Sequence, residues 1–568
     1  MNRHLAGWVV TCALAATLVV PAQASWVQVP VCTASGIQYG MRMVPDGSGG
    51  AIIAWTDTRN GPYQIFAQHL LSSDAVDPSW SSSGIMVATN VDGFDIAPDG
   101  AGGAIVAWDT GSAFDVYAHH VLAAGTLDSS WPSGGQVLAV APDNQIEIRA
   151  VSDGAGGAIV TWQDYRNSLT TGWDIYAQKV LSSGVVDPSW PTNGLAVCAS
   201  ALDQVSPALV SDGNGGAIIA WEDQRNGTDA DIFAHHLLGS GAVDPTWPAT
   251  GKELSAAADY QVNPYIVSDG SAGAIVAWTD YRSGTDADVY AMRVTASGAL
   301  GQGWHNNGEV LSNAASDQEL TDLTSDGAGG AVAVWQDRRN GVDYDIYAAR
   351  ILGTSSTPWT ADGVAVCTAS NQQVFPHLTA DGAGGFALGW QDFRNSGVDL
   401  YVHRLLATGS VDPSWPPGGH RVTFQGQMGS SQGHEPALLP DGSGGTVVAW
   451  DDACSSGCNI LAMHLTAMGR VDVPLADESS PFRVLPNPVR GSALFSFRLM
   501  GESRTWLSVH DLQGRLVSVL LNERLPGGEH HVKWEMRDQT GRPVASGVYV
   551  VRFEAEGHTL MRRIVAVR

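Results

Sequence analysis

The chain has 568 residues and a formal net charge of −27 at pH 7, with 66 glycines and 20 tryptophans. This length exceeds what one ordinary core needs, so we expect at least two domains or one long repeat architecture. Residues 481–568 hold 13 basic and 8 acidic side chains, which leaves 16 and 49 for residues 25–480. Such an acidic body argues against nucleic acid and anionic lipid as partners, because binding phosphates requires stripes of lysine and arginine.

The N-terminal residues 1–24 have the pattern of a secretory signal peptide. A basic start at Arg3 and His4 precedes an apolar run from Trp8 to Val20, and Ala22-Gln23-Ala24 offers a cleavage point before Ser25. The run is short for a bilayer, and no later stretch approaches about 18 unbroken apolar residues, so we expect no transmembrane span. The sequence therefore predicts a secreted protein, located outside the cell or at its surface.

The body of the chain, residues 25–474, repeats one unit eight times. An Asp-Gly turn with further glycines recurs at spacings of 53 to 60 residues, at Asp46, Asp99, Asp153, Asp212, Asp269, Asp326, Asp381 and Asp441. Within one unit, "VSPALV", "AIIAWED" and "DIFAHHLL" have the pattern of strands, and a segment such as "GLAVCAS" (194–200) supplies a fourth. Four short strands without helical periodicity are typical of a propeller blade.

The two ends of the body complement each other. The segment "WVQVPVCTAS" (26–35) matches the fourth strand of other units, whereas the eighth unit ends after "NILAMHL" (459–465) without one. The N-terminal strand is therefore expected to complete the last blade. We predict an all-β chain in which an eight-bladed β-propeller is followed by a small Ig-like β-sandwich. The alternative, a β-helix, usually has coils much shorter than these repeats.

Six units carry the motif Trp-x-Asp-x-Arg, for example Trp221, Asp223 and Arg225. Because side chains alternate along a strand, the three residues share one face. We expect the tryptophan to pack between blades, while the aspartate, the arginine and a second aspartate at the start of the third strand stabilise the hairpin loop. A constellation used six times indicates a structural role, so we assign no catalytic residue and no cofactor.

The loop acids allow one alternative, a calcium site. Calcium takes several oxygen ligands, and a loop such as "RNGTDAD" (225–231) could supply them. The candidate ligands are the loop and strand acids of the fourth and fifth units: Asp223, Asp229, Asp231, Asp280, Asp286 and Asp288. The spacing matches no EF-hand.

Cysteines and histidines give few further candidates. Cys454 and Cys458 enclose a short Ser-Ser-Gly loop, which oxidation outside the cell can close as a disulfide. Cys32, Cys198 and Cys367 occupy corresponding places, where a small buried side chain is expected. The neighbouring pairs His119/His120 and His235/His236 point to opposite faces of a strand, so neither pair chelates one ion, and we expect them at the surface.

Two units depart from the motif and could hold a specific site. The second contains "WDTGSAFD" (108–115) and the eighth "WDDACSSGCN" (450–459), both without the arginine. Drift between repeats explains these departures equally well.

After a polar linker at 475–481, residues 482–568 read as about seven alternating strands of a small β-sandwich. The stretch carries Asn487-Pro488, Asp511, Gly514-Arg515, Trp534, Gly541-Arg542 and Ser546-Gly547-Val548-Tyr549. On these motifs it resembles the FlgD-like Ig-type domains and the type IX secretion C-terminal sorting domains of exported bacterial proteins. The body in turn resembles exported bacterial propeller repeats. The resemblance implies a partner in the secretion machinery, or an attachment role, and no catalysis by this domain.

Three functions remain open. The first is a non-catalytic binding or surface-adhesion propeller whose ligand is an extracellular glycan or protein. The second is a carbohydrate-active enzyme, sialidase-like or a lyase, although the Asp-box pattern of sialidases is not matched. The third is a structural surface protein whose acids hold calcium.

Overall fold

The computed structural model describes residues 28–465, with gaps at 62, 112–113, 396, 424–434 and 453–458. It also describes residues 482–566, with gaps at 486–491, 500–501, 512–514, 546 and 556–557. The chain divides into two compact units, one comprising Trp26–Pro474 and the other containing Leu475–Arg568. The predicted signal peptide, the linker 475–481, Asn487-Pro488, and the cysteines Cys454 and Cys458 lie outside the described residues.

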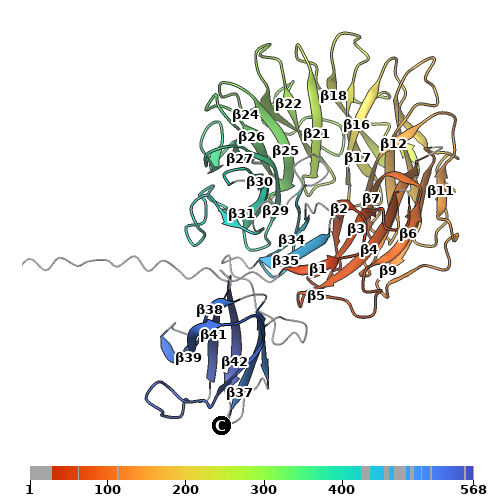
Figure 1. Cartoon of the computed structure of the whole chain (residues 1–568). Helices are drawn as coiled ribbons and strands as arrows, with labels where there is room; N and C mark the ends of the chain where they lie inside the picture. Colours follow the sequence, from red (N-terminus) through yellow and green to blue (C-terminus); the bar gives the residue numbers. More distant parts are fainter. Residues whose placement is uncertain are drawn as a thin grey trace, which may run out of the picture. The chain divides into compact units, whose positions relative to one another are not determined.

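The described residues of the first unit form eight antiparallel sheets that follow one another around an axis (Figure 1). We number them blades 1 to 8 in chain order. The innermost strands are β2 (Gln38–Pro45), β7 (Val91–Pro98), β12 (Gln145–Ser152), β16 (Gln204–Ser211), β21 (Gln261–Ser268), β25 (Gln318–Ser325), β29 (Gln373–Ala380) and β33 (Ala437–Pro440). Each contacts the next, and β33 contacts β2, so the ring is closed.

The remaining strands of each blade lie progressively farther out. The second strands are β3 (Ala51–Asp57), β8 (Ala104–Thr110), β13 (Ala158–Asp164), β17 (Ala217–Asp223), β22 (Ala274–Asp280), β26 (Ala331–Asp337), β30 (Gly385–Asp392) and β34 (Thr446–Asp451). The third strands are β4 (Gln64–Leu71), β9 (Val116–Leu122), β14 (Asp174–Val180), β18 (Asp231–Leu238), β23 (Asp288–Val294), β27 (Asp345–Ile351), β31 (Asp399–Leu406) and β35 (Ile460–Leu465).

The outermost strands are short. They are β6 (Ile85–Thr89), β11 (Gln136–Ala139), β15 (Leu195–Cys198), β20 (Lys252–Ser255), β24 (Glu309–Ser312), β28 (Val364–Cys367), β32 (His420–Arg421) and β1 (Val29–Cys32). Two-residue strands β5 (Ala75–Val76), β10 (Thr126–Leu127) and β19 (Ala242–Val243) extend three of the blades. Strand β1 pairs with β35, with Val29 opposite Ala462, which confirms that the N-terminal strand completes the last blade.

The Asp-Gly turn between the first two strands depends on local hydrogen bonds. In blade 3 the Asp153 carboxylate accepts the amides of Ala155 and Gly157, both at 2.8 Å. Gly154 and Gly156 have φ angles of 74° and 87°, which glycine adopts without penalty. A side chain at Gly157 would lie 2.2 Å from the carbonyl oxygen of Val180. The repeated glycines are therefore required by the turn itself.

In several blades, a tryptophan in the loop before the outermost strand donates a hydrogen bond to the next blade. The Trp247 indole of blade 4 donates to the carbonyl of Ala296 in blade 5 at 2.9 Å, and Trp131 of blade 2 donates to Ser182 of blade 3 at 3.2 Å. The apolar core lies between the sheets: one cluster joins Ile218 of blade 4, Trp278 of blade 5 and Trp335 of blade 6. These contacts explain why a blade is stable only beside its neighbours.

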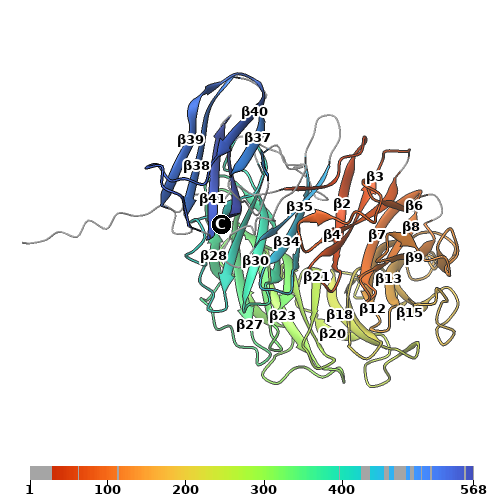
Figure 2. The ribbon, with the colours of Figure 1, turned by 90° about the horizontal axis from the view of Figure 1, so that it is seen from below.

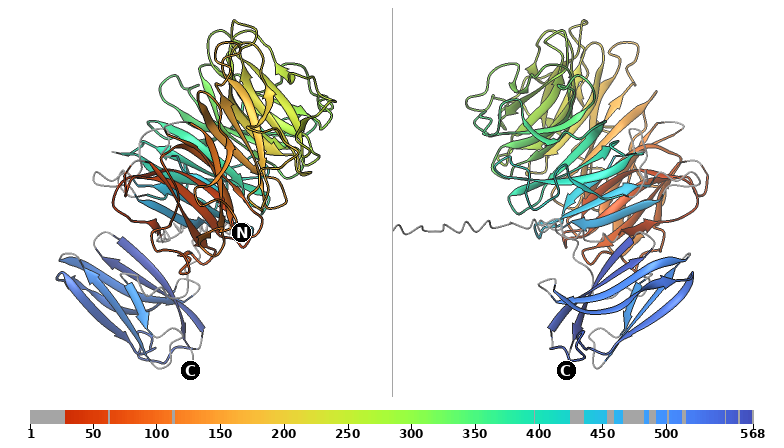
Figure 3. Two further views of the ribbon diagram at one scale, coloured as in Figure 1. Left: turned by 90° about the vertical axis from the view of Figure 1, so that its right-hand side faces the viewer. Right: turned by 60° about the vertical axis from the view of Figure 1, so that its left-hand side comes forward.

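The second unit is a small β-sandwich, as predicted. One sheet has the order β36-β37-β40 and the other β39-β38-β41-β42. The strands are β36 (Phe482–Leu485), β37 (Ala493–Leu499), β38 (Ser503–Asp511), β39 (Leu516–Leu525), β40 (Gly528–Trp534), β41 (Gly547–Ala555) and β42 (His558–Ala566). Figure 2 shows β38, β39 and β41 in one layer and β37 and β40 in the other, and Figure 3 gives two further views of these strands. Phe495, Trp534 and Val551 lie in the core between the sheets.

Candidate functional site

The Trp-x-Asp-x-Arg motif forms a closed hydrogen-bonded group at the end of the second strand. In blade 4 the fully buried Asp223 carboxylate accepts the Trp221 indole at 2.8 Å, and the Arg225 backbone amide at 3.0 Å and Nε at 2.7 Å, with a further ion pair to the guanidinium. The guanidinium carbon lies 3.9 Å from the ring centroid of Phe233. Six blades repeat this arrangement, at Asp57, Asp164, Asp223, Asp280, Asp337 and Asp392.

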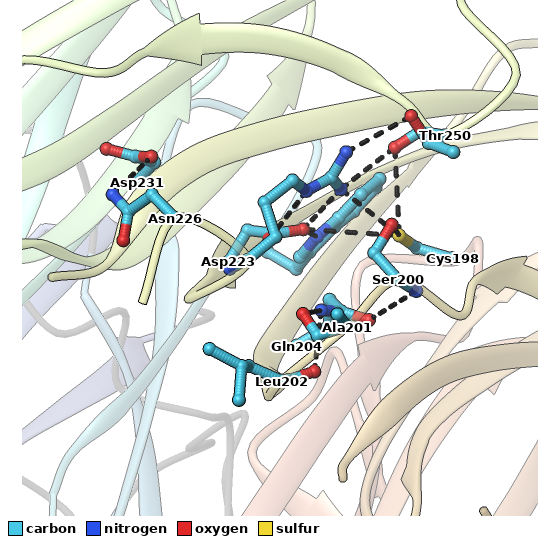
Figure 4. Close-up of polar contacts among 11 residues, drawn as sticks. Cys198, Ser200, Ala201, Leu202, Gln204, Asp223, Asn226, Asp231 and Thr250 are labelled. Carbon is cyan, nitrogen blue, oxygen red and sulfur yellow. Dashed lines mark hydrogen bonds and ion pairs between the residues drawn. The ribbon is translucent and has the colours of Figure 1, made fainter. Parts of the chain in front are cut away.

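The same arginine reaches the outer strand. The Arg225 guanidinium is hydrogen-bonded to the Thr250 carbonyl and to the Cys198 sulfur, which lies 3.2 Å away. Figure 4 shows Thr250 and Cys198 beside Asp223. Burial raises the pKa of the Cys198 thiol above its ordinary value, despite the hydrogen bond to Ser200 and the nearby arginine. Cys32 and Cys367 are equally buried and contact Arg59 and Arg394 in the same way. This confirms the prediction of small buried side chains at these positions.

The second aspartate of the motif is hydrogen-bonded to the hairpin loop, as predicted, but its partner is not the arginine. Asp231 accepts the side-chain amide of Asn226 at 3.0 Å. Burial, followed by the charges of Asp229 and Glu253, raises the pKa of Asp231 to about 6. Asn226 follows the arginine in sequence, so the loop is tied to the strand through an amide rather than through an ion pair.

Three of the other calcium candidates, Asp229, Asp280 and Asp286, are also hydrogen-bonded to nearby residues. Asp229 binds Asn226 and Thr228, and Asp286 accepts hydrogen bonds from Ser283, Thr285 and the amide of Ser316. Asp280 is held by Trp278 and Arg282, and burial raises the pKa of Asp288 to about 6. Among the described residues, no group of three or more His, Cys, Asp or Glu side chains is placed to hold a metal ion. Calcium binding remains a prediction.

The paired histidines are buried, which corrects the expectation that they lie at the surface. His236 lies between two aspartates, with Nε2 3.0 Å from Asp212 and Nδ1 2.9 Å from Asp244. Its neighbour His235 stacks on Trp247, with ring centroids 6.0 Å apart. Blade 2 repeats both contacts with His119 and His120. Adjacent blades cover both faces of this strand, so the alternation of its side chains does not by itself predict which of them are exposed.

Several cavities open on one face of the ring, which we call the entry face. On this face the innermost strand begins, the second strand ends and the third begins; Gln38 pairs with Asp57, and Asp57 with Gln64. The Asp-Gly turns, such as Asp46–Gly50, lie on the opposite face, the turn face. The cavities lined by Tyr39 and Glu147, by Asn263 and Tyr281, and by Leu202 and Tyr260 all belong to the entry face.

One register position of the innermost strands varies around the ring, with five residue types among the eight blades. It lies opposite the residue that precedes the tryptophan of the second strand, as Arg42 lies opposite Ala54, which precedes Trp55. We call these residues the axial ring; in order they are Arg42, Asp95, Arg149, Ala208, Tyr265, Asp322, His377 and Ala437. The sequences of the outer strands repeat closely from blade to blade, whereas the residue at this position varies. The repeated fold therefore does not fix which residue stands there.

Blades 1 to 3 form a cavity of about 320 Å³ beside the axial ring. Arg42 and Arg149 contribute guanidinium groups whose side chains are 50% and 39% exposed. Asp109 lies in the same lining; its carboxylate accepts the Gly93 amide at 2.5 Å and is almost fully buried. Burial, only partly opposed by that hydrogen bond, raises the pKa of Asp109 to about 7. Asp109 belongs to blade 2, in which the arginine of the motif is missing.

Blades 5 to 8 form a second cavity of about 300 Å³ at the axis. His377 lies between two carboxylates, with Nδ1 3.3 Å from Asp322 and Nε2 3.1 Å from Glu435. Burial disfavours the imidazolium, but the two carboxylates outweigh it and raise the pKa of His377 to about 10. Burial and then the charges of Asp322 and Glu435 raise the pKa of Tyr265, while Arg149 and Arg42 oppose them. Charged groups of both cavities therefore act on Tyr265. We call the linings of these two cavities together the axial mouth.

The sequence reasoning identified Asp109 only as part of a divergent unit, and it missed the axial ring. The available signal was variation: the first strand differs among units ("GMRMVP", "GFDIAP", "EIRAVS") where the second strand hardly changes. In the eighth blade, Asp451 follows Trp450 as Asp109 follows Trp108, but residues 453–458 lie outside the described chain.

No family model and no curated protein matches the chain. Among solved structures, a puromycin hydrolase aligns with a TM-score of 0.36 and 13% identity, over 71% of this chain and 58% of that one. The polysaccharide lyase Uly1 aligns with a TM-score of 0.41 and 10% identity, over 68% and 92%. PorZ, a surface component of the type IX secretion system of Porphyromonas gingivalis, aligns with a TM-score of 0.17 and 11% identity, over 91% and 80%. At this level of similarity we infer no activity from them.

Proposed function

We propose that the protein is an exported, non-catalytic binding or adhesion propeller that holds a polar extracellular ligand, a glycan or a protein segment, at the axial mouth. The observation that supports this most is the contrast between the two sets of polar residues. The six repeated aspartates are surrounded by donors from their own blade, whereas the charge at the axial ring changes from blade to blade and lies beside solvent-accessible cavities. Arg42 and Arg149 form ion pairs with Asp95 and Glu147, and the exposed part of each guanidinium can also donate hydrogen bonds to a ligand.

The test is a binding screen of the full chain on immobilised glycans and extracellular proteins, followed by titration of the strongest ligand. Arg149→Ala is expected to lower the affinity for that ligand by at least about tenfold, as for a residue at the centre of an interface. Arg338→Ala is the matched control, because it removes an exposed arginine from a loop of blade 6. Equal affinities of the two variants and the unchanged protein would rule out the axial mouth as the binding site.

A second function, action on a carbohydrate, is favoured by Asp109 specifically. A carboxyl group that stays protonated near neutral pH can donate a proton to a leaving oxygen, and ionised acids nearby can act as its counterpart. Asp92 and Glu147 line the same cavity. Release of reducing ends from a polysaccharide by the full chain, abolished by Asp109→Asn with binding retained, would establish this function. Retained activity in that variant would exclude Asp109 as the donor.

The C-terminal unit is proposed to direct export or attachment. Its own core and its two-sheet sandwich support a separate module. Within the described residues, no helix is long and apolar enough to cross a membrane. Expression of the full chain and of a chain ending at Pro474 in a bacterium with type IX secretion tests this proposal. Only the full chain is expected to reach the cell surface; equal export of both would contradict it.

A further inference from the structure

Another cavity on the entry face lies away from the axis, between the loops of blades 3, 4 and 5. It has a volume of about 560 Å³ and is lined by Tyr165, Leu169, Leu202, Asp203, Asp229 and Tyr260, together with loop threonines. We call it the rim cleft. Its size lies within the range of small-molecule sites.

The rim cleft is built from features that distinguish blade 3 from the two blades that follow it. The loop between the second and third strands spans residues 165–173 in blade 3 but only 224–230 in blade 4 and 281–287 in blade 5. This longer loop carries Trp173, whose ring lies 4.5 Å from that of Tyr165, and Trp173 donates its backbone amide to Asp203 at 3.0 Å. The loop is therefore fixed against the next blade, and the cleft wall is ordered.

Leu202 supplies an independent observation. It has a φ angle of 63°, a left-handed conformation that a leucine side chain disfavours. At the corresponding position, two residues before the innermost strand, other blades place residues that tolerate this conformation better: Gly36, Asp143, Asp259, Ser316 and Asn371. The Leu202 side chain is nevertheless 49% exposed, so burial does not compensate for the strain. A strained, exposed apolar side chain at the edge of a cavity points to a ligand that covers it.

The lining defines the chemistry of that ligand. Leu169, Leu202 and Tyr260 present apolar surface to solvent, with Tyr260 46% exposed. Asp203, Asp229 and Gln224 add acceptors and an amide, and none of the residues lining the cleft is a lysine, arginine or histidine. Two carboxylates without a cation disfavour an anionic ligand. A pyranose ring combines an apolar face, which packs on an aromatic ring, with hydroxyl groups that donate to carboxylates.

We propose that the rim cleft is a binding site for a neutral saccharide, separate from the axial mouth. The loop 226–229 also forms a wall of an adjacent cavity of about 400 Å³, which shares Thr228 and Asp229. The neutral saccharide is thus expected to be an oligosaccharide that extends from one cavity into the next. This site does not depend on the function proposed for the axial mouth.

The test uses the full chain and a panel of neutral oligosaccharides, measured by titration calorimetry: cello-, xylo-, manno-, laminari- and malto-oligosaccharides. Leu202→Asn is the decisive variant, because asparagine accepts the left-handed conformation. Its unfolding temperature is expected to equal or exceed that of the unchanged protein, while saccharide affinity falls at least about fivefold. Tyr260→Ser is expected to lower affinity further through loss of the aromatic platform.

Two control variants distinguish the rim cleft from the axial mouth and from exposed apolar surface elsewhere on the ring. Val342→Asn removes an exposed apolar side chain from a loop of blade 6 and should leave saccharide binding unchanged. Arg149→Ala, in the axial mouth, tests whether the saccharide binds there instead. Loss of saccharide binding in Arg149→Ala, but not in Leu202→Asn, would assign the saccharide to the axial mouth and overturn the proposal. Failure of the whole panel to bind would also overturn the proposal. Binding of the polycation spermidine, without binding of any saccharide, would overturn it as well, because the two carboxylates would then hold a cation.

Discussion

Replacement of Asp223 by alanine tests whether the repeated motif is a structural element. The Asp223 carboxylate is fully buried and accepts hydrogen bonds from Trp221 and from Arg225, whose side chain is only 21% exposed. Removing one partner of a buried ion pair costs about 3–5 kcal/mol, because the other charge remains without compensation. Arg225 keeps its hydrogen bonds to Thr250, so we expect the lower part of this range, about 3 kcal/mol.

The chain has two units and eight blades, so a single unfolding temperature does not give this free energy. Native-state hydrogen exchange of the amides in β17 and β18 measures the opening free energy of blade 4 directly. Asp229→Ala in the same loop is the matched control and is expected to change stability by less than about 0.5 kcal/mol. The double variant Asp223→Ala/Arg225→Met should lose less than Asp223→Ala alone plus Arg225→Met alone, since the unpaired charge is removed as well. A loss below about 1 kcal/mol in Asp223→Ala would refute the structural assignment.

Charged groups at the axis and in the loops lead to three further predictions. Burial raises the pKa of Asp109 to about 7, so the folded state binds this proton more tightly than the unfolded state, and the free energy of unfolding should fall as pH rises from about 4 to 7. Asp109→Asn should remove this fall and be about 2–4 kcal/mol more stable than the unchanged protein at pH 8. The imidazolium of His377, with a pKa of about 10, stabilises the fold fully below about pH 6.5 and loses this effect as pH rises through 10. In denaturation measured at several pH values, His377→Gln should therefore lack the decline in stability that the unchanged protein shows over this range. Because Asp223 and Asp280 are already hydrogen-bonded to tryptophan and arginine, excess chelator should leave the unfolding temperature unchanged, whereas a fall of several degrees would favour calcium at the loop acids.

The architecture followed from the sequence because its signals are local and repeated. Asp153, Gly154, Gly156 and Gly157 define a turn through their own backbone geometry, and eight such turns at regular spacing predict eight sheets. Closure by the N-terminal strand was also predictable, since Val29–Cys32 matches the missing fourth strand of the last unit. The hydrogen-bonded Trp-x-Asp-x-Arg group was predictable for the same reason, since its three residues lie on one face of a repeated strand.

The remaining features depend on neighbours that the sequence does not reveal. His119 and His235 are buried because an adjacent blade covers a face that alternation alone would leave open. The raised pKa of Asp109 arises from burial beside the axis, and the strain at Leu202 becomes visible only when its φ angle is known. Asp231 binds Asn226 instead of Arg225 because the arginine is already directed to Asp223 and the outer strand.

The most direct test of a binding site at the axial mouth is hydrogen exchange of the full chain with and without the strongest ligand from the glycan and protein screen. We expect slower exchange at the axial mouth on the entry face, in the segments that contain Arg42, Asp92 and Arg149, while the turn face at Asp46–Gly50 and Asp153–Gly157 remains unchanged. Protection confined to those Asp-Gly turns would contradict the claim that the non-repeated residues of the entry face carry the function.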